Sequence, residues 1–315
     1  MSEFGQALRD AFGPPRVFEQ LPLAPLTTFR VGGPADYLLE TRSSDEVVSA
    51  LALARAHGFP VTLLGGGSNV LVADEGIRGL VIRPRGGAIF ELDEQHVRAD
   101  AAVTINGLVR WTVLHGLGGL EAWAGTPGTV GGAVYGNAHF TGRLISECVT
   151  AVRLVDRDGR EATVTAEDMR FGYDYSRLQE GGEILLWATF HVSRGDSAAL
   201  REVARESLAY RKRTQPLDTP SAGCIFQNPV RGRDVVPDGI PWSAGALIDR
   251  AGLKGAGFGG ARVSTVHANF IVNEGGATAA DIHALIARCQ LEVRQQFGVE
   301  LREEIVRLGG STSQR

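Results

Sequence analysis

Hydrophobic patterns typical of helices and of strands alternate along most of the chain. Ser43 and Glu46 have the spacing of a capping box, which predicts that a helix begins there and ends at Gly58. Further helices are predicted at 104–115, 197–213 and 278–298, and strands at 61–64, 152–155, 162–164, 184–192, 263–273 and 301–308. The segment from 214 to about 260 is rich in Gly and Pro and shows no clear period.

The chain of 315 residues is longer than one hydrophobic core normally organises, which favours two or three domains. The pattern changes near residues 84 and 200, and we place the domain boundaries there. With 43% hydrophobic residues the chain is too apolar to be disordered.

Charge and composition exclude several classes of function. The net charge is −4 and Arg211–Arg213 is the only dense basic run, so we expect no nucleic-acid partner. No segment has the pattern of a signal peptide or a membrane helix, so we expect no membrane association. The three cysteines lie far apart without metal-ligand spacing, which indicates free thiols, a cytoplasmic location and no metal site.

Glycine is concentrated in two segments of the chain. Of 41 glycines, three stand at 65–67 and nine lie between Gly116 and Gly142. Each segment could present successive backbone N–H groups to an anion such as a diphosphate. The alternative is that these glycines form tight turns or places where backbone packs on backbone. Neither segment fits a P-loop or a well-placed dinucleotide-binding fingerprint.

Six ordered segments resemble the UDP-N-acetylenolpyruvoylglucosamine reductase (MurB) family. They are residues 27–35, 64–71, 125–133, 220–229, 247–255 and 267–273. The resemblance implies an α+β protein with a two-domain FAD-binding fold of the vanillyl-alcohol-oxidase type and a C-terminal α/β substrate-binding domain. It implies FAD-binding subdomains at 1–84 and 85–200, the second joined by the last strand at 301–309, and a substrate-binding domain at 201–300. The short link from Val192 to Ser197 resembles the shorter family type, which lacks an extra substrate-capping loop.

The resemblance also implies the reaction and its ligands. The expected protein is a cytoplasmic monomer that uses non-covalent FAD and NADPH to reduce the enolpyruvyl ether of UDP-N-acetylglucosamine to UDP-N-acetylmuramate in peptidoglycan precursor synthesis. The residues implied for FAD are Leu64, Gly65, Gly66, Gly67, Ser68, Asn69, Val70, Thr126, Pro127, Gly128, Thr129, Gly132 and Asn137. Those implied for the substrate are Tyr173, Gln227, Asn228, Lys254 and His267. Lys254 could instead be a solvated loop residue and His267 a structural histidine.

Two residues are implied as acids. Cys224 stands where the family usually has a proton-donating serine, and a thiol is a stronger acid than a hydroxyl. The alternative for Cys224 is a small buried thiol. Counting back five residues from Gly309 gives Glu304 as the catalytic glutamate, and its neighbour Glu303 would face the opposite side of a strand.

One position departs from the family pattern. Where the family has an arginine that supports the enolate, this chain has Asp174, and an acid cannot replace a guanidinium at a forming anion. Arg177 is the candidate for this role, with another cation as the alternative. A slow enzyme or a non-catalytic flavin-binding paralogue also fits this change. Gln227 replaces a frequent lysine, which removes a further positive charge. A flavin oxidase or dehydrogenase of the same fold, acting on a small hydroxy acid, is the other alternative.

Overall fold

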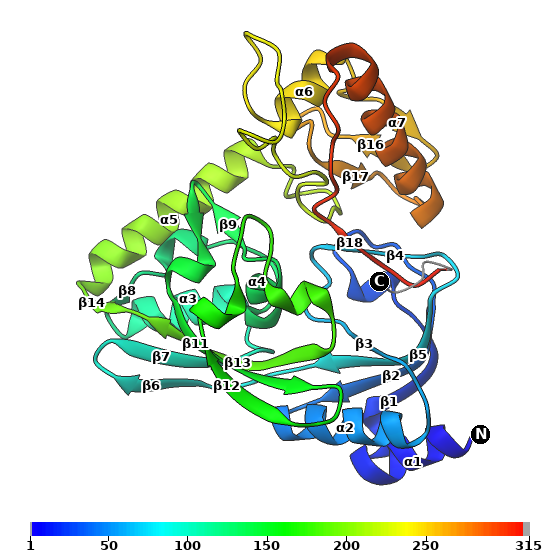
Figure 1. Cartoon of the computed structure of the whole chain (residues 1–315), viewed down its shortest axis with the longest axis vertical. Helices are drawn as coiled ribbons and strands as arrows, with labels where there is room; N and C mark the ends of the chain where they lie inside the picture. Colours follow the sequence, from blue (N-terminus) through cyan, green and yellow to red (C-terminus); the bar gives the residue numbers. More distant parts are fainter. Residues whose placement is uncertain (1, 311–315) are drawn as a thin grey trace.

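The structure, a computed structural model, describes residues 2–310. Two sheets lie side by side in the lower part of the molecule, and a smaller C-terminal part stands above them (Figure 1). Helix α5 (Ser197–Thr214) runs from the lower part to the upper one. Among the described residues, no helix is both long and apolar enough to cross a bilayer.

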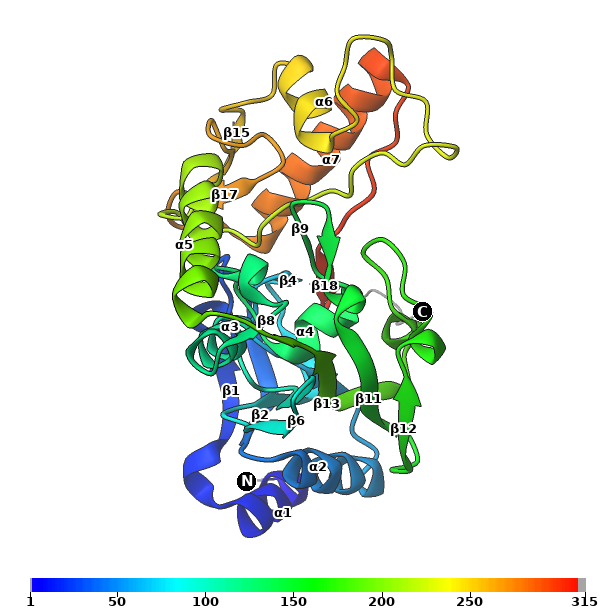
Figure 2. The ribbon, with the colours of Figure 1, turned by 90° about the vertical axis from the view of Figure 1, so that its left-hand side faces the viewer.

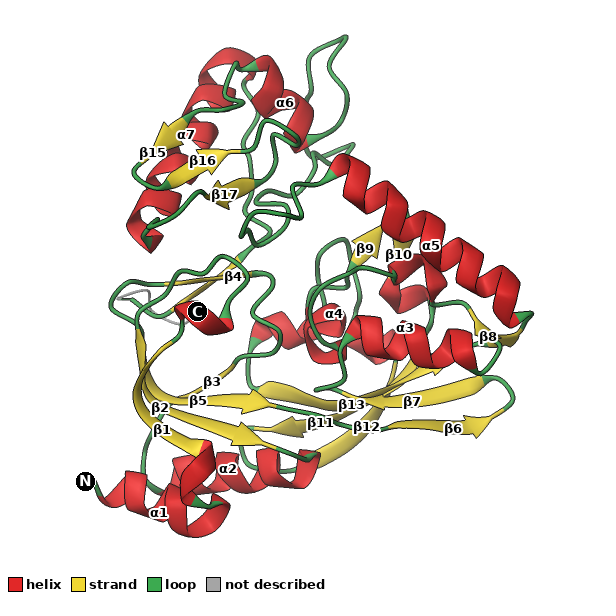
Figure 3. Cartoon of the chain, turned by 180° about the vertical axis from the view of Figure 1, so that it is seen from behind, coloured by secondary structure: helices red, strands yellow, loops and turns green. Residues whose placement is uncertain are grey.

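The first sheet has four strands in the order β1-β2-β5-β3, with β1 antiparallel to β2 and the other pairs parallel. Its strands are β1 (Val17–Pro22), β2 (Pro34–Thr41), β5 (Ile77–Pro84) and β3 (Val61–Leu63). Leu80 and Ile82 of β5 pack in the cluster with helices α1 (Glu3–Phe12) and α2 (Ser44–Ala56), whereas Val81 packs on the other face. The sheet is therefore buried on both sides, with α1 and α2 under it (Figure 3).

The predicted helix that begins at Ser43 is confirmed as α2. Ser43 Oγ accepts a hydrogen bond from the Glu46 N–H, as expected. The Glu46 carboxylate, however, accepts from the Arg42 N–H at 2.7 Å, one residue earlier than in a capping box.

The second sheet is antiparallel throughout, in the order β12-β11-β13-β7-β6. Its strands are β12 (Glu161–Thr165), β11 (Val149–Asp156), β13 (Glu183–His191), β7 (His96–Asp100) and β6 (Ile89–Asp93). Helices α3 (Ile105–Leu114) and α4 (Val130–Tyr135) pack with this sheet in one hydrophobic core (Figure 2). The strands predicted at 152–155, 162–164 and 184–192 and the helix predicted at 104–115 are confirmed.

Shorter elements complete the lower part. They are the paired strands β8 (Leu117–Gly118) and β14 (Ser193–Arg194), the hairpin of β9 (His139–Phe140) and β10 (Arg143–Leu144), and 3-10 turns at Pro14–Arg16, Ala24–Leu26, Glu121–Trp123, Ile145–Glu147, Glu167–Met169 and Arg177–Glu180.

The C-terminal part packs two helices with three short antiparallel strands. These are α6 (Ala244–Arg250), β15 (Gly257–Phe258), β16 (Ala261–Val263), β17 (Ile271–Asn273) and α7 (Ala279–Phe297). Helix α7 begins with a complete capping box at Thr278 and ends at Gly298 in the left-handed conformation, which confirms that prediction. The predicted continuous strand at 263–273 is wrong, because a turn closed by the Ser264 and Phe270 backbones separates β16 from β17.

The last strand connects different parts from those expected. β18 (Val306–Leu308) pairs in parallel with β4 (Val70–Val72), which lies within residues 1–84. The prediction that it joins residues 85–200 is therefore wrong. The segment just before β18 is not a regular strand, since the Glu304 N–H donates to the Ile225 carbonyl of the C-terminal part. The end of the chain thus connects the C-terminal part to residues 1–84, through a separate two-stranded sheet of β18 and β4.

Candidate active site

The two glycine-rich loops meet in the fold. A Cβ added at Gly66 would come within 2.7 Å of Gly128 Cα, and one at Gly65 within 2.8 Å of Thr129 Oγ1. Glycine is required at both positions because any side chain would push the loops apart. The alternative of backbone packed on backbone is therefore confirmed for this pair of loops.

The same loops also offer free hydrogen-bond donors. Within residues 2–310, the backbone N–H groups from Gly65 to Asn69 donate no hydrogen bond to protein. A row of unpaired N–H groups in a loop suits an anion such as a diphosphate. The packing role and an anion-binding role are thus compatible in residues 65–69.

The other residues expected around these loops have structural contacts as well. The Leu64 N–H donates to Ile82, Val70 begins β4, and Asn137 is fully buried with its amide bonded to Gly172 and Ser146. Thr129 Oγ1 caps α4 by accepting from the Gly132 N–H. These contacts hold the loops in shape.

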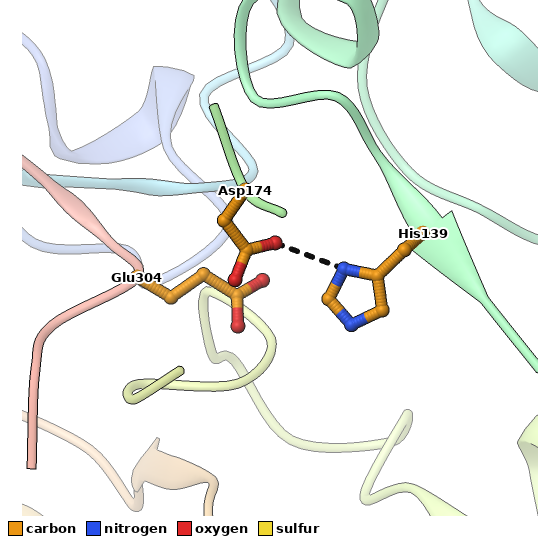
Figure 4. Close-up of side chains that lie close together, drawn as sticks. All are labelled: His139, Asp174 and Glu304. Atoms are coloured by element: carbon orange, nitrogen blue, oxygen red, sulfur yellow. Dashed lines mark ion pairs between the residues drawn. The ribbon is translucent and has the colours of Figure 1, made fainter. Parts of the chain in front are cut away.

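Three ionisable side chains from distant segments converge beside these loops. His139 Nδ1 lies 2.9 Å from an Asp174 carboxylate oxygen, and Glu304 lies against both residues (Figure 4). Donor atoms of the three side chains are within 4.8 Å of one another. Asp174 already binds the imidazole, and the buried Arg211 adds positive charge that would repel a metal ion. We therefore assign the cluster to proton transfer and to the stabilisation of charge.

His139 is placed by a tight hairpin. Phe140 pairs with Arg143 across a two-residue turn, and both turn residues, Thr141 and Gly142, have positive φ angles of 49° and 80°. Such a turn matches the twist of the flanking strands. It directs His139 toward the cluster from β9.

Asp174 is placed by a second turn. Gly172 and Tyr175 exchange both backbone hydrogen bonds, with Tyr173 and Asp174 between them. Asp174 has a φ of 52°, a left-handed conformation that aspartate tolerates better than most residues. Its side chain is 6% exposed.

Glu304 and Cys224 are brought together by backbone pairing. The Glu304 N–H donates to Ile225, the residue after Cys224, and Glu303 forms a bridge with Phe226. The two glutamates diverge, as expected: the Glu303 carboxylate binds Arg307, whereas Glu304 faces the cluster. Asn69 Nδ2 donates to the Glu304 carbonyl at 3.1 Å, which connects the glycine loop to this segment.

Burial favours the protonated forms of Glu304 and Cys224. It raises the pKa of Glu304 to about 8, and the negative charge of Asp174 adds to this effect. Burial, followed by the charges of Glu304 and Asp174, raises the pKa of the Cys224 thiol well above its usual range. The hydrogen bond that His139 donates to the Asp174 carboxylate raises the pKa of His139. At neutral pH the cluster therefore holds a thiol and a mostly protonated carboxylic acid, beside a histidine whose pKa is raised.

Arg211 is a cation that the sequence analysis did not find. It lies in the last turn of α5 with its guanidinium 3.6 Å from the centre of the Phe140 ring, and Nη2 donates to Thr126 Oγ1 at 2.7 Å. Burial lowers the pKa of Arg211 to about 10, so it stays charged at neutral pH. The basic run at 211–213 was a signal, but nothing in it separates this buried residue from its exposed neighbours.

Arg177 does not supply the expected cation. Its guanidinium binds both carboxylate oxygens of Glu183, at 2.8 and 2.7 Å, and donates to the Asp168 carbonyl. This pairing disfavours a catalytic role for Arg177, which stays a prediction. Within residues 2–310, the positive group beside Asp174 and Glu304 is His139, and Arg211 adds positive charge near His139 and Cys224.

The residues expected for the substrate form two groups. Tyr173 accepts a hydrogen bond from the Asn228 N–H at 3.3 Å, and burial raises its pKa to about 12. The Asn228 side chain accepts from the Ala244 N–H, while the Gln227 N–H donates to Arg302. These contacts join the turn of Asp174 to the C-terminal part.

Lys254 and His267 form the second group. Lys254 binds Asp249 at 3.0 Å. Burial and the nearby Lys254 charge lower the pKa of His267, whose Nδ1 accepts from the Asn269 N–H. Asn269 in turn binds both backbone groups of Phe226, which supports the segment that carries Cys224.

Comparison with known proteins gives consistent matches over nearly the whole chain. Residues 215–308 match the family "UDP-N-acetylenolpyruvoylglucosamine reductase, C-terminal domain", and residues 35–165 match the family "FAD binding domain". The UDP-N-acetylenolpyruvoylglucosamine reductase of Heliobacterium modesticaldum is 40% identical over 94% of this chain and 92% of its own, and that of Bacillus velezensis is 39% identical over 94% and 95%. The crystal structure of the reductase (MurB) from Thermus caldophilus superposes with a TM-score of 0.77 at 34% identity, over 93% of this chain and 99% of that one.

Proposed function

Because the chain belongs to the UDP-N-acetylenolpyruvoylglucosamine reductase family, a family of FAD-dependent oxidoreductases, we propose that it reduces the enolpyruvyl ether of UDP-N-acetylglucosamine to UDP-N-acetylmuramate, with NADPH as reductant and Cys224 as proton donor. The observation that carries this proposal is the meeting of three elements at Glu304: the glycine loop through Asn69, the Cys224 segment through Ile225, and the Asp174 turn.

The glycine loops fit a phosphate-bearing cofactor. Residues 64–70 and 126–129, with Gly132 and Asn137 supporting them, would hold non-covalent FAD, and the free N–H groups from Gly65 to Asn69 would face its diphosphate. When bound, FAD would accept a hydride from NADPH and deliver it to the methylene carbon of the enol ether.

The protein's part is to manage the negative charge that follows. Charge develops on the carbon next to the methylene and on its carboxylate, and that carbon needs a proton. Cys224 keeps its proton until this moment because burial disfavours the thiolate. After it donates, Arg211 and a hydrogen bond from Asn269 stabilise the thiolate. Protonated Glu304 donates a hydrogen bond toward the enolate.

The remaining residues orient the substrate. Tyr173, Gln227 and Asn228 lie where the C-terminal part meets the Asp174 turn, and Lys254 with His267 would bind the nucleotide diphosphate side. We further propose FAD-binding subdomains at 1–84 and 85–200, a substrate-binding domain at 201–300, and a cytoplasmic monomer with small-molecule partners.

Half-reaction kinetics test the proposal. In Cys224→Ala, NADPH is expected to reduce the flavin at the wild-type rate, whereas reoxidation by the enolpyruvyl substrate falls on the order of 10²–10⁴-fold. Cys224→Ser is expected to retain part of the reoxidation, because a hydroxyl can also donate a proton. Cys148→Ser is the matched control, since this half-buried thiol binds the Gly119 carbonyl instead.

Two results would contradict the proposal. Full product formation by Cys224→Ala, followed by mass spectrometry, would remove Cys224 from the mechanism. A wild-type flavin that NADPH reduces but the enolpyruvyl substrate does not reoxidise would overturn the reductase assignment. It would leave the hydroxy-acid enzyme or the flavin-binding paralogue.

A further inference from the structure

The Asp174 carboxylate creates a charge problem in the proposed site. The resemblance places an arginine at this position, where positive charge would support the enolate. An aspartate there adds negative charge instead, beside a substrate that carries a carboxylate. A site of this kind needs a cation from another element.

We propose that His139, protonated and held in place by Asp174, is the cation that contacts the carboxylate and forming enolate of the substrate. The proposal rests on the proposed function and names the residue that replaces the family's arginine. His139 comes from the β9 hairpin, 35 residues before Asp174 in the chain.

The orientation of the imidazole supports this role. Its Nδ1 is bound to Asp174, and its other ring nitrogen is turned away from that carboxylate (Figure 4). The His139 side chain is 27% exposed, whereas that of Asp174 is 6% exposed. The ring therefore stands between a buried anion and the more open side of the cluster, with Nε2–H free to donate to a carboxylate oxygen.

The Asp174 carboxylate is committed to this pair. Its second oxygen is buried and has no hydrogen-bond partner among residues 2–310. An isolated buried carboxylate is costly unless a cation lies close to it. Asp174 therefore favours the imidazolium form of His139 and fixes which nitrogen points toward the site.

The charges that face His139 add up to a site for an anion. They are Asp174 from its turn, Glu304 from the segment before β18 and Arg211 from α5, together with the neutral Tyr173 ring. With Glu304 protonated, two cations face one anion. If His139 were neutral, the charges of Arg211 and Asp174 would cancel, and little would attract the substrate carboxylate.

Arg211 is less suited to the contact than His139. Its guanidinium is stacked on Phe140, one nitrogen is used by Thr126, and the residue is 6% exposed. We assign to Arg211 the long-range stabilisation of the Cys224 thiolate and to His139 the direct hydrogen bond. His139 keeps its proton throughout and acts only as a hydrogen-bond donor and a positive charge.

Single-turnover kinetics test the assignment in the FAD-loaded enzyme. His139→Gln is expected to slow reoxidation by the enolpyruvyl substrate about 10²–10³-fold, the usual loss for one donor to a forming oxyanion, and to leave reduction by NADPH near the wild-type rate. His96→Gln is the matched control, because His96 binds Asp93 at the same 2.9 Å on the surface. It is expected to change neither rate.

Two further variants separate a charge role from a structural one. In a Glu304→Gln background, where Glu304 cannot titrate, the reoxidation rate should fall as pH rises through the pKa of His139. Asp174→Asn should move this fall to lower pH because it removes the group that raises that pKa. The double variant His139→Ala with Asp174→Arg returns a cation to the family's position. In this double variant, the substrate should reoxidise the flavin at least tenfold faster than in His139→Ala alone.

The outcomes point to different conclusions. Wild-type reoxidation and an unchanged pH profile in His139→Gln would overturn the assignment. So would a comparable loss in Arg211→Gln together with a pH profile that Asp174→Asn does not move, because the cation would then be Arg211. A wild-type enzyme that the substrate does not reoxidise would overturn the proposed function itself, before any variant is compared.

Discussion

Residues 2–310 contain two histidine–aspartate pairs with the same closest distance and different surroundings. His139 lies 2.9 Å from Asp174, and His96 lies 2.9 Å from Asp93. The Asp174 side chain is 6% exposed and that of Asp93 is 60% exposed. Contact distance alone therefore does not distinguish the pair at the proposed active site from the pair on the surface.

The two pairs differ in their access to water. On the surface, water satisfies both partners when they separate, so the pair contributes little. In the buried pair, separation would leave the Asp174 carboxylate with no partner among residues 2–310, and the charges of Glu304 and Arg211 also act on His139. Burial and neighbouring charge thus turn an ordinary contact into a means of holding a proton.

After Cys224 and His139, the largest expected effect comes from Glu304, which has no counterpart beside the surface pair. Glu304→Gln is expected to lower the rate of reoxidation by the substrate by about 10²-fold, since a neutral amide is a weaker donor to the enolate than a carboxylic acid. Stopped-flow absorbance of the flavin measures this rate. Glu303→Gln, whose carboxylate binds Arg307 outside the cluster, should stay near wild type.

The same Glu304→Gln variant should also change how stability depends on pH. The folded pKa of about 8 lies above the ordinary value of 4.5, so between these values the unfolded chain releases a proton that the folded protein keeps. Wild-type stability therefore falls as pH rises across this window, by up to about 1.4 kcal/mol per pH unit from this group. The stability of Glu304→Gln relative to wild type should rise from pH 5 to pH 8 in denaturant unfolding. A constant difference would contradict the raised pKa.

A smaller effect is expected in the titration of His139 itself. Asp174 raises the pKa of His139, so this pair stabilises the fold fully below the unfolded histidine pKa, and the contribution disappears as pH rises through the folded pKa. Histidine NMR signals should show the His139 titration moving to lower pH in Asp174→Asn, while the His96 signal stays in place. Equal movement of both signals would mean that the variant perturbs the protein as a whole.

Much of the fold could be predicted because its signals are local. The capping residues Ser43 and Thr278 and the left-handed Gly298 mark helix ends within one turn, and the structure has helices there. Helix α6 was missed because it has only seven residues inside a Gly- and Pro-rich segment. The partner of β18 was predicted wrongly because nothing near Val306 in the sequence indicates which distant strand it joins.

The candidate site shows the same division between local and distant information. Ordered motifs led to Cys224 and Glu304, and the structure places these two residues near each other, although their roles remain predictions. Arg177 was the candidate for the missing cation, but Glu183 binds it. His139 was missed because its contact with Asp174 exists only in three dimensions. The one signal in the sequence was the anomaly at Asp174 itself, which requires a compensating cation somewhere.

The smallest change in stability and turnover is expected at the surface pair of His96 and Asp93. His96→Gln removes the imidazole that binds Asp93, yet the Gln95 N–H still donates to that carboxylate, and water can replace the lost partner. Exposed ion pairs are also screened by salt, so the thermal midpoints of His96→Gln and wild type should agree at both 0.05 and about 0.5 M salt. Turnover should not change either. A large loss of activity in His96→Gln would mean that the 2.9 Å contact matters wherever it occurs, and burial would no longer explain why His139 is special.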